Sequence, residues 1–510
     1  MSGPSPPAPL RVVIAGGGTA GWMTAAGLLG VLGPRIADVR LIESDEIGTV
    51  GVGEATLPHM RQFNGAVGIV EADMMRRTHA TFKLGIEFVG WGAEPYIHPF
   101  GAYGRSLGGV PFHQQHARAR AAGHERPLAD YSFAVAAARA GRFDVPADEP
   151  DLPQSTYDYA YHFDAGLYAA FLRAFCERRG AERTEGRIVN VQLEATSGDI
   201  AALTLQSGEV VEGDLFIDCS GFRALLIGDA LDAPWEDWSR WLPCDRAFAV
   251  PSARLPDLPP YTRATAREAG WQWCIPLQHR TGNGHIFSTA FTEETRAAEL
   301  LMANLPTPAE GDPRLLRFQA GRRARSWRRN CVAVGLASGF LEPLESTSIY
   351  LIQAAVMMLI RLFPQAQVDP ALADEFNREM DVQYARIRDF LILHYHRQDR
   401  DDGEMWRHCR NMAVPDSLAE KIHLFRERGL VPDYKDGLFT PPSWLSVLLG
   451  QGVQPRAWNP RAEALPLPDL LQELDAMRAG IEAGVAAMPG HARFLEDYCP
   501  STPAVRPQAA

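Results

Sequence analysis

The chain has 510 residues, a net charge of −12, 46% hydrophobic residues and 22% charged residues. This balance is typical of globular proteins, and the length predicts two lobes or one large domain with an addition. A nucleic-acid surface needs clustered Lys and Arg. The richest basic run, residues 322–329, is short and interrupted, so we expect it to be solvated or salt-bridged, with no nucleic acid bound.

The sequence also lacks the signals of a membrane or secreted protein. No stretch reaches the about 18 consecutive apolar residues of a membrane helix, and the N-terminus does not resemble a signal peptide. The seven cysteines are dispersed, without a CxxC pair or a metal-ligand spacing. We therefore expect buried, reduced thiols, no metal, no membrane partner and a cytoplasmic location.

The first elements in the chain predict a βαβ unit. Residues 11–15 form an apolar strand, residues 16–21 a glycine turn, and residues 22–32 a helix. A second strand at 39–42 ends at Glu43. This order is the opening of a dinucleotide-binding fold, because the glycine turn directly follows a strand and begins a helix.

Each part of the glycine turn has a physical role in that fold. Gly16 makes the tight turn, Gly18 lets the backbone approach a pyrophosphate, and Gly21 allows close helix–strand packing. The helix N-terminus adds unpaired N–H groups and a partial positive charge. Glu43 would accept a hydrogen bond from a ribose hydroxyl. The alternative is a tight strand–helix turn without a ligand.

Later strands return the chain to the same sheet. A three-stranded meander at 188–211 leads into an apolar strand at 215–218, and a strand at 331–335 precedes a helix starting near Ser346. This interrupted layout favours FAD over NAD and predicts an α/β, Rossmann-like fold of the glutathione-reductase type. Beyond residue 365, apolar spacing predicts helices at 372–392 and 469–487.

These elements predict four parts along the chain. They are a disordered tail (1–9), an FAD-binding core (10–365) with substrate-facing insertions around 90–160 and 230–300, a helical substrate-covering region (366–499) and a second disordered tail (500–510).

Five sequence motifs carry a resemblance to a known family. They are GGGTAGWM at 16–23, GVGEAT at 51–56, TFKLG at 81–85, GWQWCIP at 270–276 and FLEPLESTS at 340–348. Together, and in this order, they resemble the flavin-dependent tryptophan halogenases between about residues 11 and 360. The GWxWxIP segment is the most specific of them.

Lys83 has two interpretations. In a single strand over residues 82–88, Lys83 and Glu87 would share one face, which favours an exposed lysine paired with Glu87. The resemblance instead implies that Lys83 is catalytic and receives hypohalous acid. An ammonium there polarises the HO–X bond, whereas desolvation favours a neutral amine that can itself be halogenated.

Glu345 also has two interpretations. It precedes an apolar helix, so it could be an acid favoured by the helix dipole. The resemblance implies a catalytic carboxylate beside the substrate, which stabilises a cationic ring and helps to remove its proton. It further implies a halide site at the N–H groups of Thr347 and Ser348. Better-known members have Gly at the position of Ser348, which would strain Ser if φ were positive there.

The resemblance also implies a barrier between the flavin and the substrate, and an aromatic substrate site. Trp271 and Trp273 would face one side of a strand, either as paired core aromatics or as a wall between flavin and substrate. His98 is either an indole-stacking residue or a turn residue at a Pro kink. The implied substrate contacts are His98, Phe100, Ser346 and Trp444. The expected FAD contacts are Gly16, Gly18, Thr19, Ala20, Gly21, Glu43, Leu336 and Ile349, with Ile188 expected from its position in the chain.

The resemblance thus implies an FADH2-dependent halogenase. A separate, transiently bound flavin reductase would supply reduced FAD, which with molecular oxygen forms a flavin hydroperoxide that converts chloride or bromide to hypohalous acid. The small aromatic substrate would be free indole, a substituted indole or tryptophan, since the region around Tyr434 offers no convincing copy of the family's amino-acid clamp. A homodimer is compatible with the sequence. The alternatives are a flavin-dependent aromatic monooxygenase and a non-catalytic flavin-binding protein.

Overall fold

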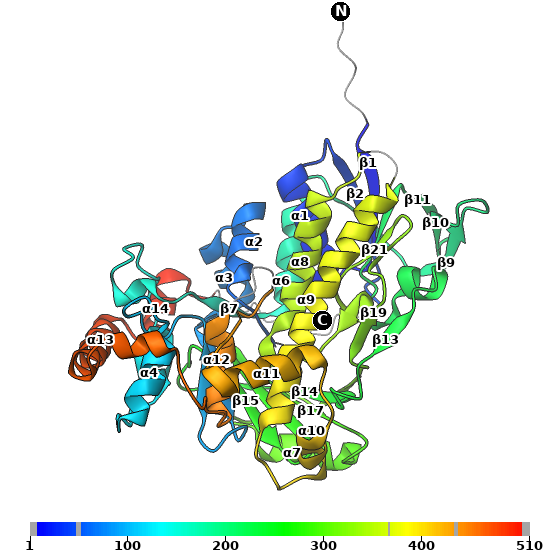
Figure 1. Ribbon diagram of the computed structural model, residues 1–510. Helices are drawn as coiled ribbons and strands as arrows, with labels where there is room; N and C mark the ends of the chain where they lie inside the picture. Colours follow the sequence, from blue (N-terminus) through cyan, green and yellow to red (C-terminus); the bar gives the residue numbers. More distant parts are fainter. Residues whose placement is uncertain (1–7, 47–52, 366–367, 433–436, 502–510) are drawn as a thin grey trace, which may run out of the picture.

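The first strand lies inside a mostly parallel sheet that forms the upper part of the molecule (Figure 1). In this computed structural model, the described residues are 8–46, 53–365, 368–432 and 437–501. The 6-stranded sheet has the order β20 (Trp327–Arg328), β21 (Cys331–Ala333), β12 (Leu215–Asp218), β1 (Leu10–Ala15), β2 (Ala37–Glu43) and β8 (Glu182–Glu185). All neighbouring pairs except β20–β21 are parallel.

The strands of this sheet are apolar on both faces, so both faces are covered, one by helices and the other by the antiparallel meander of residues 188–212. Helix α1 (Thr19–Gly27) packs against α6 (Ala165–Glu177) and α8 (Thr347–Arg361), and α8 packs along α9 (Pro370–Arg397). The meander β9 (Ile188–Leu193), β10 (Ile200–Leu205) and β11 (Val210–Glu212) forms a separate 3-stranded antiparallel sheet. The predicted α/β, Rossmann-like fold is confirmed, although α1 begins earlier than expected and residues 28–32 form a wider helical turn.

A second sheet of 7 strands lies below the first (Figure 1). Its order is β18 (Arg314–Arg317), β14 (Arg246–Ala253), β17 (Arg280–Phe287), β16 (Gly270–Pro276), β15 (Thr262–Arg267), β5 (Gly85–Val89) and β6 (Tyr96–Pro99). A 3-stranded sheet, which contacts the second sheet through β16 and β17, consists of β3 (Gly53–Ala55), β7 (Ala160–Asp164) and β4 (Thr81–Lys83).

The single strand expected over residues 82–88 is therefore wrong. The chain changes sheets at Leu84, whose N–H donates to the carbonyl of Pro260 and whose carbonyl accepts from the N–H of Phe100. These two bonds replace ladder pairing at the corner, so β4 and β5 belong to different sheets. Periodicity alone could not detect this break, because apolar residues continue to alternate across it.

The C-terminal third is helical. Its helices after α9 are α10 (Glu404–Asn411), α11 (Asp416–Arg428), α12 (Pro441–Gly450), α13 (Leu467–Ala487) and α14 (His491–Tyr498). Helix α13 lies beside α4 (Phe112–Ala121) and α5 (Phe133–Arg139) at the edge of the molecule (Figure 1). The remaining helices are α2 (His59–Val67), α3 (Glu71–Thr78) and α7 (Glu294–Ala303), and the remaining strands are β13 (Trp235–Asp237), β19 (Gly321–Arg323) and β22 (Gly339–Phe340).

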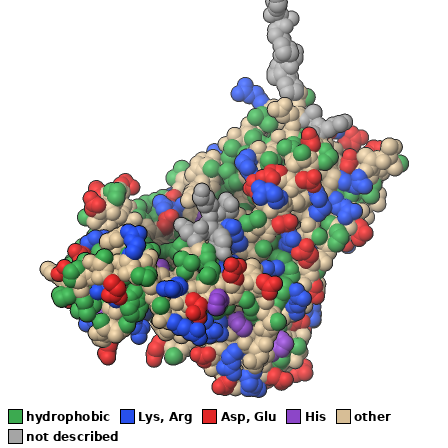
Figure 2. All heavy atoms as spheres, viewed as in Figure 1, with side chains coloured by type: hydrophobic (Ala, Val, Ile, Leu, Met, Phe, Trp, Pro, Cys, Tyr) green, Lys and Arg blue, Asp and Glu red, His purple; other side chains and the backbone are tan. Residues whose placement is uncertain are grey.

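The structure can be compared with two predictions made from composition, one for the basic run at residues 322–329 and one for the cysteines. The basic run at 322–329 is salt-bridged as predicted: Arg322 pairs with Glu236 and Arg325 with Asp374. On the face shown in Figure 2, acidic and basic side chains are interspersed. The cysteines are free, and all except the half-buried Cys274 are buried. Across the described ranges, no helix combines the length and apolar character needed to cross a bilayer.

Candidate active site

The glycine turn has the shape of a dinucleotide cradle. Gly16 has φ 115°, and a Cβ there would lie 2.3 Å from the carbonyl oxygen of Cys219. A Cβ on Gly21 would lie 1.9 Å from the carbonyl oxygen of Gly16. Helix α1 begins at Thr19, directly after Gly18, and no described side chain caps it. Its first N–H groups therefore have no side-chain partner among the described residues, which suits a pyrophosphate.

Other expected FAD contacts lie around this turn. Gly335 lies so near Ala20 that a Cβ on it would be 2.9 Å from the Cβ of Ala20, and Gly335 begins the short turn containing the half-buried Leu336. Ile349 is in the first turn of α8, which packs on α1. Ile188 begins β9, two residues after Gly186, whose N–H donates to the carbonyl oxygen of Glu43.

Glu43 lies at the carboxyl end of β2, as the βαβ unit predicts. Its Oε1 is 2.5 Å from Nε of Arg183, and its Oε2 accepts from Nε1 of Trp22 at 3.3 Å. Arg183, on β8, is a neighbour that no local sequence pattern predicts. The bonds hold the carboxylate beside Gly17, where a Cβ would overlap it. Gly51 and Val52 of the GVGEAT motif lie outside the described residues.

Lys83 is fully buried, so the interpretation as an exposed lysine is wrong. Its Nζ donates to the carbonyl oxygen of Thr56 at 3.0 Å and to Oγ of Ser346 at 2.7 Å, and lies 5.1 Å from the ring centre of Phe100. Glu87 instead pairs with Arg263 on β15. Burial lowers the pKa of the Lys83 ammonium to about 7, opposed by the charge of Glu345.

Glu345 is also fully buried, in a 3₁₀ turn (Pro343–Glu345) before α8. Its Oε2 is 2.8 Å from Nδ1 of His98, and its Oε1 is 2.8 Å from Nε2 of His394 on α9. Burial alone would raise the pKa of Glu345, but the two imidazoles outweigh it and lower the pKa to about 2. A role limited to the helix dipole is therefore wrong, because the carboxylate is committed to two side chains.

The start of α8 connects these two groups. Ser346 has φ 58°, and its hydroxyl binds Lys83 instead of capping the helix. In the described part of the chain no side chain caps α8, so the N–H groups of Thr347 and Ser348 are available to an anion. Ser348 lies inside the helix and is not among the described residues with positive φ, so replacing the family's Gly causes no strain there.

Aromatic side chains surround the Glu345–His98 pair. His98 lies in strand β6, so the interpretation as a turn residue is wrong. Its ring centre is 6.3 Å from that of Phe100, 6.1 Å from that of Phe439 and 5.7 Å from that of Phe390. Phe390 and Phe439 stack at 3.9 Å, and sequence reasoning had not singled out either as a substrate contact.

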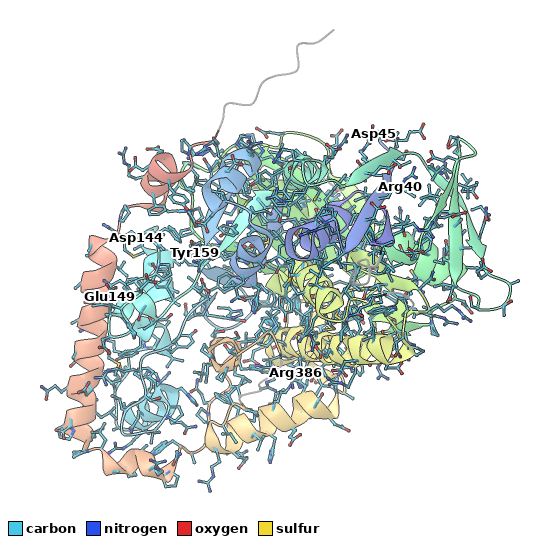
Figure 3. All side chains as sticks on the ribbon, turned by 90° about the horizontal axis from the view of Figure 1, so that it is seen from above. Arg40, Asp45, Asp144, Glu149, Tyr159 and Arg386 are labelled. Carbon is cyan, nitrogen blue, oxygen red and sulfur yellow. The ribbon has the colours of Figure 1, made fainter. Side chains whose placement is uncertain are left out.

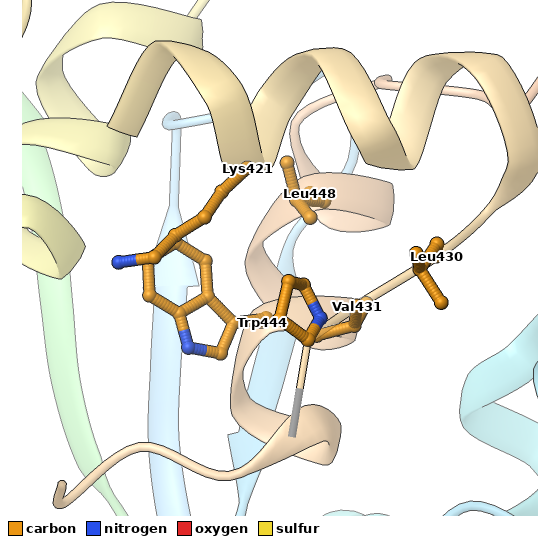
Figure 4. Close-up of a pocket in the computed structure, with 6 residues that line it drawn as sticks. Lys421, Leu430, Val431, Trp444 and Leu448 are labelled. Atoms are coloured by element: carbon orange, nitrogen blue, oxygen red, sulfur yellow. The ribbon is translucent and has the colours of Figure 1, made fainter. Parts of the chain in front are cut away.

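Trp444 is separated from His98 by the ring of Phe390. It packs edge-to-face on Phe390 at 5.1 Å and lines a small pocket with Leu448, Val431 and Lys421 (Figure 4). Lys421 Nζ is 4.7 Å from the Trp444 ring centre. The structure thus brings His98, Phe100 and Ser346 to the Lys83–Glu345 pair and places Trp444 behind Phe390. Tyr434 lies outside the described residues.

Trp271 and Trp273 point to the same side of β16, as their spacing predicts, with ring centres 6.1 Å apart. Nε1 of Trp271 donates to Oε2 of Glu342 at 3.0 Å, and the hydroxyl of Tyr395 donates to the same oxygen. Burial raises the pKa of Glu342 to about 7. This buried acid, three residues before Glu345, was not predicted, because its partners are distant in the sequence. The described His, Cys, Asp and Glu side chains form no group suited to a metal ion.

The chain is similar to known halogenases over almost its whole length. Residues 11–467 match the tryptophan halogenase family. Tryptophan 6-halogenase SttH of Streptomyces toxytricini is 36% identical, with 97% of each chain covered. Among solved structures, a flavin-dependent halogenase from Xanthomonas campestris has a TM-score of 0.93 and 49% identity, covering 97% of this chain and 99% of its own. BrvH, a flavin-dependent halogenase from Brevundimonas sp. BAL3, has a TM-score of 0.92 and 46% identity, covering 96% and 99%.

Proposed function

The chain belongs to the flavin-dependent tryptophan halogenase family, and on that premise we propose that it installs chloride or bromide on an indole-type aromatic. Free indole, a substituted indole and tryptophan are the candidate substrates. The observation that carries this proposal is the buried pair Lys83 and Glu345, joined through Ser346 and bordered by aromatic rings. A flat aromatic ring is held well between such side chains.

The cradle at Gly16–Gly18–Gly21, with Glu43, would hold the FAD pyrophosphate and ribose. Bound reduced flavin supplies, with oxygen, the oxidising power that converts halide to hypohalous acid. The N–H groups of Thr347 and Ser348 would bind the halide, because an uncapped helix N-terminus favours an anion.

Lys83 would act where the electrophile meets the arene. A pKa near 7 populates both its protonated and neutral forms at neutral pH. The ammonium form donates a hydrogen bond that polarises HO–X, and the neutral form can carry the halogen on nitrogen. Thr56 and Ser346 hold Nζ in place for either role.

Glu345 would stabilise the positive charge that develops on the ring. Its low pKa keeps it ionised, and a buried, preoriented carboxylate interacts strongly with such a charge. A carboxylate of this pKa is a weak base, but a ring carbon bearing both hydrogen and halogen loses its proton readily. We assign Glu345 the electrostatic role first and proton removal second, with His98 and His394 as its positioning residues.

Several broader features belong to the same proposal. Residues 366–499 would cover the substrate, since α9 carries Phe390 and His394 and α12 carries Trp444. A separate flavin reductase would deliver the reduced cofactor transiently. We propose a cytoplasmic enzyme, either monomeric or homodimeric.

One assay tests the function. Enzyme, FAD, a flavin reductase and NADH are incubated with chloride or bromide over an indole panel, and products are read by mass spectrometry. Lys83→Ala should abolish halogenated product while FAD binding persists, and Glu345→Gln should lower kcat roughly 100-fold. Glu87→Gln, a carboxylate on the adjoining strand paired with Arg263, is the matched control. Unchanged product with Lys83→Ala would refute the proposal.

A further inference from the structure

The strand that carries Lys83 is held by the C-terminal helix. Among the described strands, β4 pairs only with β7, so one edge of β4 has no strand neighbour. The N–H of Phe82 lies on that edge, and Phe82 is fully buried. A buried backbone donor needs an acceptor, and Nε2 of His491 supplies it at 3.1 Å.

The two bonds of His491 determine its protonation state. Nδ1 lies 2.7 Å from the carbonyl oxygen of Leu258, which can only accept, whereas the N–H of Phe82 can only donate. The proton must therefore be on Nδ1, and the ring must be neutral. His491 is buried and bridges two backbone segments in one fixed orientation.

Other residues of α14 pack around Phe82, the residue whose N–H donates to His491. The Phe82 ring stacks on Phe143 at 3.9 Å between centres and meets Phe494 edge-on at 5.5 Å. At the far end of α14, the hydroxyl of Tyr498 donates to Glu71 at 2.9 Å. Glu71 also accepts from Tyr159, which Figure 3 labels near Asp144.

A second neutral histidine, His162, binds the first residue of β4. The Thr81 hydroxyl donates to the carbonyl oxygen of Pro276 at 2.7 Å, so it must accept from Nδ1 of His162 at 2.8 Å. Burial holds the pKa of His162 well below its usual value, so the ring is neutral and its Nε2 accepts from the hydroxyl of Thr262 at 2.9 Å. The strand is thus held at Thr81 and at Phe82, the two residues directly before Lys83.

We propose that His491 is a positioning residue for Lys83, acting through the N–H of Phe82. Successive side chains of a strand point to opposite faces, so a clamp on Phe82 sets the Cα of Lys83 without contacting its Nζ. A displacement of about 1 Å at a reacting group can cost about 100-fold in rate. The inference rests on the proposed function, since it gives Lys83 a catalytic role to support.

Two substitutions separate this role from simple packing. His491→Gln places an amide oxygen where Nε2 lies and can keep the bond to Phe82. His491→Asn places its polar atoms where Nδ1 lies and can keep only the bond to Leu258. Each variant, with Tyr498→Phe as the control at the far end of α14, is assayed for halogenation, FAD binding and hydrogen exchange of the peptide containing Phe82.

We expect His491→Asn to speed exchange at Phe82 and to lower kcat at least about tenfold at unchanged KM and FAD affinity, whereas His491→Gln and Tyr498→Phe stay within about threefold of wild type. Faster exchange with unchanged kcat, or equal losses in the Gln and Asn variants, would overturn the inference. If the Asn variant does not fold, a loss of kcat in a folded Gln variant with unchanged exchange would overturn it, and retained kcat would support it. Wild type that fails to halogenate would refute the proposed function, while exchange would still report the contact.

Discussion

Replacing Lys83 by Met should change how stability depends on pH. A shift of one pKa unit corresponds to about 1.4 kcal/mol. The fall in the pKa of Lys83 from the ordinary 10.5 to about 7 therefore means that folding disfavours its charged form, relative to its neutral form, by roughly 5 kcal/mol. Between these two pH values the folded protein holds Lys83 largely neutral, whereas the unfolded chain holds it protonated. Rising pH therefore stabilises the folded wild type, and the Met variant lacks this contribution.

The difference in unfolding free energy, wild type minus Lys83→Met, should rise by about 2 kcal/mol from pH 7.5 to 9.0. Urea unfolding of both proteins at the two pH values measures it, and all other titrating groups cancel in the comparison. A difference that stays constant within about 0.5 kcal/mol would show that Lys83 keeps an ordinary pKa, and the argument from burial would fail.

Three further perturbations have defined outcomes. Burial lowers the pKa of His285 and His491 from 6.5 to about 4, so protonation of these two rings favours the unfolded chain as pH falls, and the unfolding free energy of wild type minus that of a His285→Gln/His491→Gln variant should fall by roughly 4 kcal/mol from pH 7 to pH 5 in urea unfolding; an equal difference at both pH values would contradict this. Glu342→Leu should cost about 1–3 kcal/mol in urea unfolding by leaving Nε1 of Trp271 unpaired, whereas Glu342→Gln keeps an acceptor and should cost less. Ser348→Gly should leave the halide dependence of kcat unchanged and lower stability by at most about 1 kcal/mol, since Ser348 is already helical; a gain in halide affinity would argue against the helical geometry.

The cofactor half of the molecule could be predicted from local signals. The strand, glycine turn and helix at residues 10–27 are consecutive, and Gly16 and Gly21 each have a steric reason that the structure bears out. Glu43 follows at the end of the next strand. Such information lies within a short stretch of sequence, so one chain suffices to read it.

The reaction site could not be derived in this way. Lys83 and Ser346 are 263 residues apart, and His491 and Phe82 are 409 apart, so no local pattern links them. The family motifs indicated Lys83 and Glu345. His394 lies on α9, where the apolar spacing predicts a helix but does not distinguish this histidine from its neighbours as a site residue. Lysine is rarely buried, so its residue type alone predicted that Lys83 is exposed. The oxygens of Thr56 and Ser346 that hold its ammonium group come together only in the tertiary structure.

The central claim is that the arene is attacked by a halogen electrophile at Lys83 and not by oxygen from the flavin. The most direct test feeds the enzyme with reductase, NADH, oxygen and indole in halide-free buffer, and then adds bromide. The account predicts no oxygenated indole before the addition and brominated indole after it. Hydroxylated indole in the absence of halide would contradict it.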